Sequence, residues 1–224
     1  MKNPLLAILL LSLSIGIAHD AFAQKSSAFR IARLKYDGGG DWYNDPLEEP
    51  TLLRFVSEHT GINVDPNYYY VDIMSEDIFS YPFLFMTGHG NIRFTDEQAR
   101  SLRKYLDDGG FLYADDDYGM DEAFRREMKN VFPDGKLVPL PYSYGLYNCV
   151  YDFSHGPPKI QDWDDGKPPA AFGIFIGKRL AVYYTTECNP SDGWDPPEVH
   201  GDPENKRLEA LEFGTNILYW TLTH

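Results

Sequence analysis

Hydrophobic and polar positions alternate with two different periods along the first two thirds of the chain. Short runs rich in β-branched and aromatic residues predict strands at 29–36, 62–73, 81–88 and 110–116. Between them, apolar residues recur at helical spacing over 44–61, 95–110 and 120–132. Strands that alternate with helices in this order predict a parallel sheet with helices on both faces.

Residues at the ends of the predicted helices support these boundaries. Asp45 and Pro46 are placed to begin the first helix, and Gly61 to end it. In the second helix, Thr95 and Gln98 have the spacing of a capping box. The expected fold class is therefore α/β, with a doubly wound, mostly parallel sheet of the flavodoxin-like kind.

The last third of the chain has a different amino-acid composition. From Pro139 it is rich in Pro, Gly, Tyr and Asp, which predicts an irregular appendage over the sheet edge. Within it, 172–177 and 179–186 are expected to form a hairpin across Gly177 and Lys178.

A final helix is predicted over 202–224 and should pack back on the sheet. Asp202 is expected to cap it, and Pro203 to take its first helical position. Its expected apolar stripe consists of Leu208, Leu211 and Leu218.

The N-terminus has the pattern of a Sec-type signal peptide over residues 1–23. Lys2 precedes an apolar run too short to span a membrane, and small residues end at Ala23, after which cleavage is expected. This predicts a periplasmic or secreted protein, with 24–224 as a single α/β domain and no membrane insertion after signal cleavage.

Composition narrows the classes of partner. The formal net charge is -14, which repels phosphate backbones and anionic lipid and so argues against nucleic acid and membrane surfaces. Cations, neutral glycans, other small molecules and envelope proteins remain open as partners. Cys149 and Cys188 are the only cysteines, and the sequence leaves open whether they form a disulfide.

Three polar, glycine-bearing loops follow predicted strands, at 37–45, 88–91 and 115–121. In a doubly wound sheet such loops gather at the edge where ligands bind. The candidate ligand-binding residues are Asp37, Gly38, Gly39, Asp41, Trp42, Tyr43, Gly88, Gly90, Asn91, Asp115, Asp117, Tyr118, Glu187 and Trp194. The candidate catalytic groups are His89 and Asp116, and the candidate metal ligands are His89, Asp116 and Asp117.

His89 has two interpretations. Its flanking glycines, Gly88 and Gly90, could simply make a tight turn, with His89 bonded to a neighbouring loop. Alternatively, its imidazole carries protons or binds a divalent cation. The three aspartates at 115–117 alternate in direction, so at most two should face the cleft; one could cap the next helix, while another serves as a cation ligand or general base.

Weaker candidates lie elsewhere. Trp42 and Tyr43 could stack on sugar rings or roof the core. A second polar group in the last third could complete the pocket if that segment folds over the edge; it comprises His155, Glu187, Asp192, Trp194, Asp195 and His200. The sequence contains neither H-E-x-x-H nor G-x-S-x-G, which removes the usual signatures of zinc proteases and serine esterases.

The stretches "RLKYDGGGDWYNDP", "YPFLFMTGHGNIRF", "GGFLYADDDYG" and "GTNILYWTLT" resemble the bacterial domain of unknown function family 4159. The likeness covers nearly the whole mature chain. It implies a fold near the class I glutamine amidotransferase-like domains, beside the trehalose-utilization-like proteins. Those enzymes carry a cysteine after the strand that "GGFLYADDDYG" resembles, whereas this chain has aspartates, so the resemblance implies no thiolate chemistry there. Family members are often encoded near MoxR-type ATPases and von Willebrand factor A-like membrane proteins, which implies a cell-envelope setting.

Two functional hypotheses follow. The first is an exported binding or assembly module without a nucleophile, holding a glycan, a cation or an envelope protein at the sheet edge. The second is a metal-assisted or acid/base hydrolase of an envelope substrate that uses His89 and an aspartate, with a divalent cation as its cofactor. Binding is favoured because no complete catalytic set is present and because fold alone implies no activity.

Overall fold

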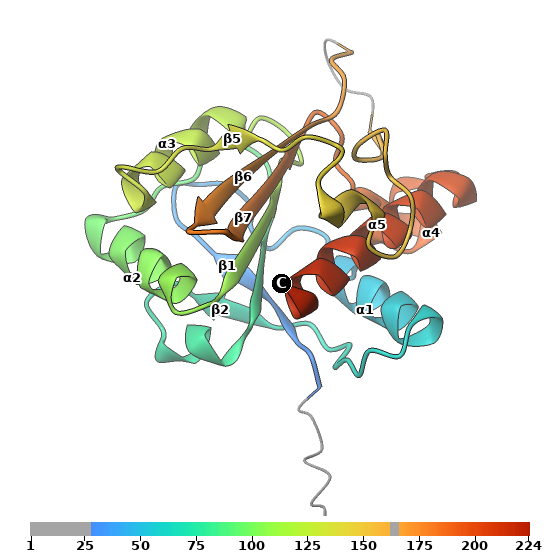
Figure 1. The fold of residues 1–224 in the computed structure, drawn as a ribbon, viewed down its shortest axis with the longest axis horizontal. Coiled ribbons are helices and arrows are strands. Elements are labelled where there is room, and N and C mark those ends of the chain that lie inside the picture. The colour runs from blue at the N-terminus through green and yellow to red at the C-terminus, as the bar shows by residue number, and fades with distance from the viewer. Residues whose placement is uncertain (1–27, 162–165) are drawn as a thin grey trace, which may run out of the picture.

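A seven-stranded sheet runs through the middle of the molecule, in the order β2-β1-β3-β4-β7-β6-β5 (Figure 1). The computed structural model describes residues 28–161 and 166–224. The expected signal peptide, 1–23, lies outside the described residues. Among those that are described, no helix has the length and apolarity needed to cross a membrane.

Five strands form the parallel part of the sheet. They are β1 (Ile31–Lys35), β2 (Tyr70–Asp72), β3 (Phe83–Met86), β4 (Phe111–Asp115) and β7 (Arg179–Thr186). Two further strands, β6 (Ala170–Ile176) and β5 (Val138–Pro139), extend it with antiparallel pairing. The structure therefore confirms a mixed α/β fold with a mostly parallel sheet.

The hairpin in the last third of the chain was expected to be part of an appendage over the sheet edge, and this expectation is wrong. The hairpin itself is present, since β6 and β7 pair antiparallel across Gly177 and Lys178. However, β7 also pairs parallel with β4, so it is an interior strand of the sheet. The residues from Leu180 to Thr186 are all buried, and an apolar strand covered on both faces is stable only inside a sheet.

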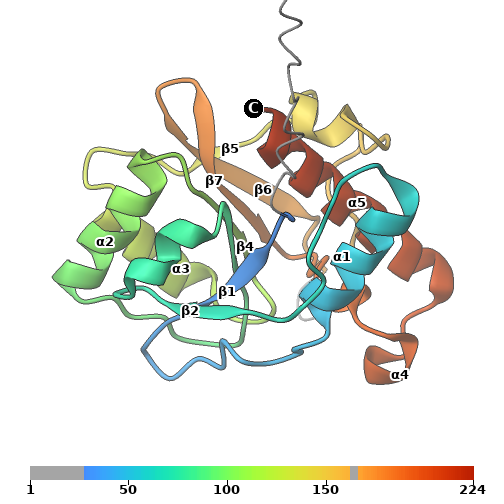
Figure 2. The ribbon, with the colours of Figure 1, turned by 90° about the horizontal axis from the view of Figure 1, so that it is seen from below.

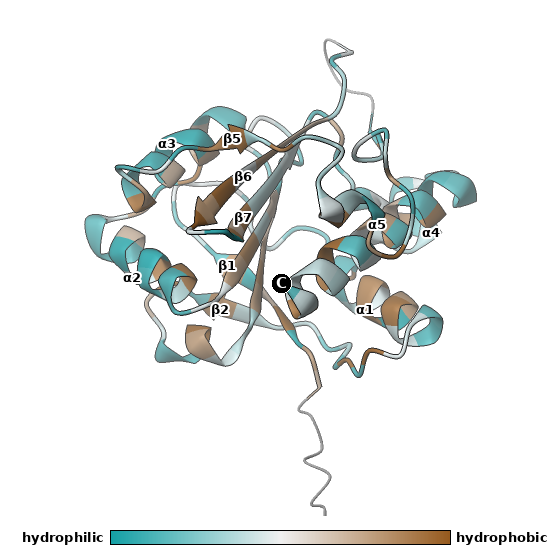
Figure 3. Ribbon diagram, viewed as in Figure 1, coloured by the Kyte–Doolittle hydropathy of each residue, from teal (hydrophilic) through white to brown (hydrophobic). Residues whose placement is uncertain are grey.

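Helices cover both faces of the sheet, as Figures 1 and 2 show. One face carries α2 (Asp96–Asp107) and α3 (Asp121–Val131), and the other α1 (Glu48–His59) and α5 (Glu204–Thr223). Because strand side chains alternate, Leu84 and Met86 pack towards α2 and α3, while Phe83 and Phe85 pack towards α1 and α5. Figure 3 shows the strands as mainly hydrophobic and α2 and α3 as largely hydrophilic.

The helix ends match the predictions in part. The capping box is confirmed: Gln98 N donates to Thr95 Oγ1, and Thr95 N donates to Gln98 Oε1. Asp45 does not cap α1, which starts at Glu48 after an uncapped turn. Asp202 does not cap α5 either, because Pro203 occupies that position without a side-chain bond.

The α5 helix packs back on the sheet as expected. Leu211 and Leu218 are buried, but Leu208 is 45% exposed and does not belong to the stripe. Cys149 and Cys188 are both free; Cys188 is buried, and the Cys149 thiol contacts backbone oxygens of Leu146 and Asn216.

A buried arginine on β1 joins the sheet to α1. Arg33 is fully buried, and its guanidinium donates to both oxygens of Glu49, at 2.6 and 2.8 Å, and to Glu48 Oε2 at 2.6 Å. It also lies over the Phe85 ring, 4.8 Å from the centroid. Burial opposes the charge on Arg33, but Glu49 and Glu48 outweigh it and raise its pKa.

The same guanidinium holds the loop that follows β1. Arg33 Nη1 donates to the backbone oxygens of Trp42, at 3.2 Å, and Asn44, at 2.9 Å, and Nη2 donates to that of Asp45 at 3.4 Å. One buried side chain therefore fixes the strand, the helix start and the connecting loop in one arrangement.

We expect Arg33→Met to lower the free energy of unfolding by about 3–5 kcal/mol, because it leaves two buried carboxylates without their cation. Urea unfolding followed by circular dichroism measures this. The control is Arg103→Met, which removes a half-exposed pair with Asp107 and should cost under about 1 kcal/mol. Equal costs for the two variants would contradict the role assigned to Arg33.

Candidate functional site

Four loops meet at the carboxyl edge of the parallel strands. They follow β1, β3, β4 and β7, and the first two flank the point where the strand order reverses direction. Open α/β sheets bind ligands at such a switch point. The three loops expected at one edge are therefore joined there by a fourth, which begins after Thr186.

Asp117 connects these loops. Its Oδ1 accepts from Asn189 Nδ2 at 2.7 Å, and its Oδ2 accepts from Asn44 Nδ2 at 2.7 Å. His89 Nδ1 lies 3.2 Å from Oδ2. One carboxylate thus contacts the loops after β1, β3 and β7 while it belongs to the loop after β4.

His89 lies between two carboxylates. Its Nδ1 is 3.0 Å from Asp41 Oδ2 and 3.2 Å from Asp117 Oδ2, and its backbone N–H donates to Asp41 Oδ1 at 2.5 Å. Carboxylates at Nδ1 orient the ring and leave Nε2 as the nitrogen for a ligand or a proton. The imidazole side chain is 51% exposed.

The turn around His89 is also tight, as its glycines suggested. Gly88 has φ +135°, and a Cβ there would lie 2.4 Å from the Tyr36 hydroxyl and 3.1 Å from Asp41 Oδ1. Glycine is therefore required at this position. The same tight turn also places His89 beside Asp41.

The other two aspartates of the triplet stabilise the fold. Asp116 accepts from Met120 N at 2.8 Å, from Thr186 Oγ1 at 2.9 Å and from the Tyr184 hydroxyl at 3.4 Å, which holds the start of α3. Its carboxylate is thus bonded to α3 and β7, and the carboxylate beside His89 is that of Asp117.

Asp115 lies on the opposite face of β4 from Asp116. It accepts from Thr185 Oγ1 at 2.5 Å and from Ser191 N at 2.8 Å. Burial raises its pKa to about 7, although these bonds work in the other direction. As expected from strand alternation, the triplet does not converge, and only Asp117 lines the pocket described next.

An open pocket of about 420 Å³ lies at this edge, and we call it the rim pocket. It is lined by Asp45, His89, Asp117, Tyr118, Gln161, Asp192 and His200. The volume is sufficient for a small ligand. The sequence suggested that the segment containing Asp192 could complete a pocket with His89, and the structure brings these residues together.

His200 forms a second imidazole and carboxylate group at the rim pocket. Its Nε2 lies 3.1 Å from Asp195 Oδ2, 3.6 Å from Asp45 Oδ1 and 3.9 Å from Asp192 Oδ1. Burial works against its protonation, but Asp192, Asp45 and Asp195 together outweigh burial and raise the His200 pKa.

Several predicted residues hold the loops and do not line the pocket. Asp37 Oδ2 accepts from Gln98 Nε2 at 2.9 Å, and its backbone oxygen accepts from Arg93 N at 2.7 Å. Asn91 Nδ2 donates to Gly38 O at 3.0 Å. Gly39 and Gly90 have positive φ angles, +94° and +79°, and Gly90 N donates to Tyr118 O at 3.0 Å.

The remaining aromatic and acidic candidates lie elsewhere. Trp42 packs against the core and contacts the Tyr70 ring, with centroids 5.6 Å apart, and Tyr43 is 63% exposed. Trp194 is buried and donates to Ala210 O. Glu187 pairs with Lys167, and His155 is exposed; neither lines the rim pocket.

The sequence matches the family described as Domain of unknown function (DUF4159) over residues 30–222. The chain belongs to the DUF4159 family. No curated protein matches it. The family resemblance stated from the sequence motifs is therefore confirmed, and the matched region contains every residue of the rim pocket.

Sequence reasoning missed several residues that build the site in this DUF4159 chain. They are Arg33, Asn44, Asp45, Glu48 and Asn189. A charged residue inside an apolar strand was the available signal for Arg33, because such a residue needs a buried partner. Among the described residues, the non-glycine positions with positive φ are Asp45, Glu187 and Asn189, all in the loops of this edge.

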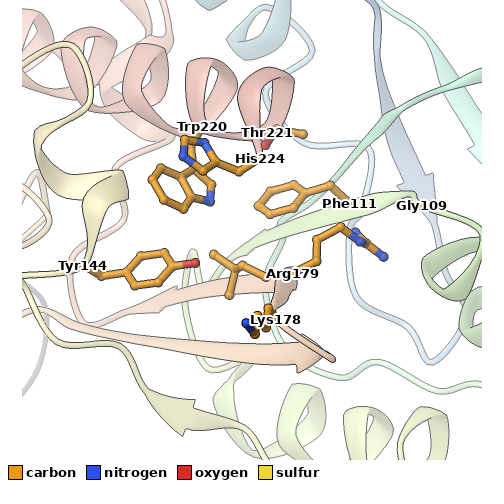
Figure 4. Close-up of a pocket in the computed structure, with 9 residues that line it drawn as sticks. Gly109, Phe111, Tyr144, Lys178, Arg179, Trp220, Thr221 and His224 are labelled. Carbon is orange, nitrogen blue, oxygen red and sulfur yellow. The ribbon is translucent and has the colours of Figure 1, made fainter.

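A different hollow, shown in Figure 4, lies at the amino ends of β4 and β7. It has a volume of about 360 Å³, and Phe111, Tyr144 and Trp220 line it. Arg179 lies there too, but its guanidinium donates to the backbone oxygens of Gly110 and Leu106. None of the predicted site residues of this DUF4159 domain lines it.

We expect the DUF4159 chain to lose stability as pH rises from about 4 to about 7, in part through Asp115. An unfolded aspartate has a pKa of about 3.9. The folded state raises the pKa of Asp115 to about 7, so folding is favoured by the protonated form. This contribution is complete below about pH 4 and is lost as pH passes through about 7.

Asp115→Asn should reduce this loss, because an amide stays uncharged over this pH range and its oxygen can still accept from Ser191 N. Urea unfolding of both proteins from pH 5 to pH 8 measures the difference, with the exposed Asp134→Asn as control. Parallel stability curves for wild type and Asp115→Asn would refute the assignment.

Proposed function

We propose that this chain is an exported cell-envelope binding module whose rim pocket holds a cationic ligand. The supporting observation is the lining of that pocket, in which the carboxylates of Asp45, Asp117 and Asp192 surround two imidazoles. With a formal net charge of -14 for the whole chain, the potential at this edge favours positive groups. Export is proposed from the N-terminal sequence pattern.

The chemistry of the lining supports binding over covalent catalysis. Of the seven residues that line the rim pocket, none is a serine, a threonine or a cysteine. The position where amidotransferases carry cysteine is occupied by the aspartates from Asp115 to Asp117, each held by hydrogen bonds. The imidazoles could act as bases, but the pocket lining offers them no serine, threonine or cysteine to activate.

We also propose that the fold is related to the flavodoxin-like and class I glutamine amidotransferase-like domains. The order β2-β1-β3-β4-β7 of the parallel strands supports this, because it has the form 2-1-3-4-5. A binding pocket at the switch point agrees with that relationship. The activity of such enzymes does not follow from it.

Three probes of equal length and different charge test the proposal: butane-1,4-diamine, butane-1,4-diol and butanedioate. We expect only the diamine to bind saturably, with an affinity that falls as salt is raised. Isothermal titration calorimetry on the mature chain measures this. Asp192→Asn should weaken diamine binding at least about fivefold, whereas Asp134→Asn should not. The proposal would be contradicted if all three probes bound equally well or if none of them bound.

A second candidate function is supported by the geometry of His89. A half-exposed imidazole oriented by Asp41 and Asp117 can act as a general base in a hydrolase. The substrate would be a glycan or another envelope polymer.

For this candidate, we expect His89→Gln to reduce hydrolysis of isolated envelope polysaccharide by about 10²–10⁴-fold. New reducing ends measure the reaction, and His155→Gln, which changes an exposed histidine away from the rim pocket, is the control. Failure of the wild-type protein to release any reducing ends would remove this candidate and leave the binding function standing.

A further inference from the structure

Four side chains that can ligate a metal ion gather around that of Asp45. Ligand atoms of Asp45, Asp192 and His200 all lie within 4.8 Å of one another, and so do those of Asp45, Glu48 and Asp195. Asp45 belongs to both groups and joins them into one cluster. The members come from the loop before α1, from α1 itself, and from the segment of η3 (Asp192–Trp194) and α4 (Pro197–His200).

The distances suit a shared ion. From His200 Nε2, the carboxylate oxygens of Asp195, Asp45 and Asp192 lie at 3.1, 3.6 and 3.9 Å. Metal ions bind imidazole nitrogen and carboxylate oxygen at about 2.1 Å, so neighbouring ligand atoms lie about 3–3.5 Å apart. The spacing of 3.1 Å to Asp195 lies in this range, and the spacings of 3.6 and 3.9 Å to Asp45 and Asp192 slightly exceed it.

A buried oxygen without a hydrogen-bond donor is the second observation. Asp195 is 1% exposed; its Oδ2 faces His200, while its Oδ1 has no hydrogen-bond partner among the described residues. A buried carboxylate oxygen normally has a donor or a cation beside it. A metal ion bound to Oδ1 would be the positive partner that this oxygen lacks.

The charge balance in the cluster also favours a cation. Arg33, the nearest buried cation, is bonded to Glu48 and Glu49, and Arg207 Nε donates to the backbone oxygen of Asp195 and not to its carboxylate.

The ligands are held in place before any ion arrives. Asp45 has a left-handed backbone, with φ +45°, and its carbonyl accepts from Arg33. Asp195 N donates to Asp192 O at 3.2 Å, which fixes these two ligands relative to each other. Such preorganisation lowers the cost of binding.

We propose that Asp45, Asp192, Asp195 and His200 bind a divalent metal ion at the rim pocket. The proposal rests on the cation-binding function proposed above and names the class of cation. Oxygen ligands with one imidazole suit Mn²⁺, which accepts both donor types, better than they suit a soft metal that prefers thiolates. Glu48 lies beside the site with one oxygen bonded to Arg33.

Titration of the chelator-treated mature chain with Mn²⁺ tests this, with electron paramagnetic resonance reporting free Mn²⁺ and thermal unfolding reporting stability. We expect one saturable site in the micromolar range and a rise in melting temperature. Asp192→Asn and His200→Gln should each weaken binding at least tenfold. Asp134→Asn, which removes an exposed carboxylate outside the cluster, should bind as wild type does.

His200 is exposed on α4, so His200→Gln is expected to fold, and circular dichroism checks this. Wild-type affinity in folded His200→Gln and Asp192→Asn would overturn the site, as would wild-type Mn²⁺ binding weaker than millimolar. If Mn²⁺ does not bind but butane-1,4-diamine does, the metal-site proposal is wrong and the proposal of a cation-binding pocket is retained. If both probes fail, both proposals are wrong.

Discussion

The buried charge of Arg33 is the constraint on which the rest of the structure depends. A guanidinium in the middle of a hydrophobic sheet is stable only if its N–H donors are all bonded to acceptors. Here Glu48 and Glu49 supply the carboxylates, and the loop before α1 supplies its carbonyls. The first turn of α1 and the loop must therefore take one conformation. That conformation places Asn44 and Asp45 at the edge where the other loops arrive.

The polar edge is held together by shared acceptors. Asp117 receives donors from two loops besides its contact with His89, and Asp116 and Asp115 bind opposite faces of the sheet. This arrangement resists adjustment, because moving one loop breaks bonds in another. It also concentrates negative charge, which is the electrostatic basis of the proposed cation binding.

The sequence predicted the elements better than the site. Apolar runs and the Thr95 and Gln98 capping box located strands and helices, because these signals are local. The position of β7 beside β4 depends on long-range pairing, which no local pattern specifies. His89 was found because glycines flank it, whereas the grouping of Asp45 with His200 was missed, since only the folded chain brings them together. Asp116 and Asp117 are adjacent in the sequence, yet the Asp116 carboxylate accepts from Met120 and Thr186, whereas that of Asp117 accepts from Asn44 and Asn189.

The interior position of β7 determines when the domain can be completed during synthesis. Until residues 179–186 emerge, β4 has an open flank, Asp115 lacks Thr185, and Asp117 lacks Asn189. An N-terminal fragment would expose an apolar strand edge of the kind that aggregates or recruits chaperones. The parallel part of the sheet is therefore completed only when β7, the last strand in the sequence, has been made.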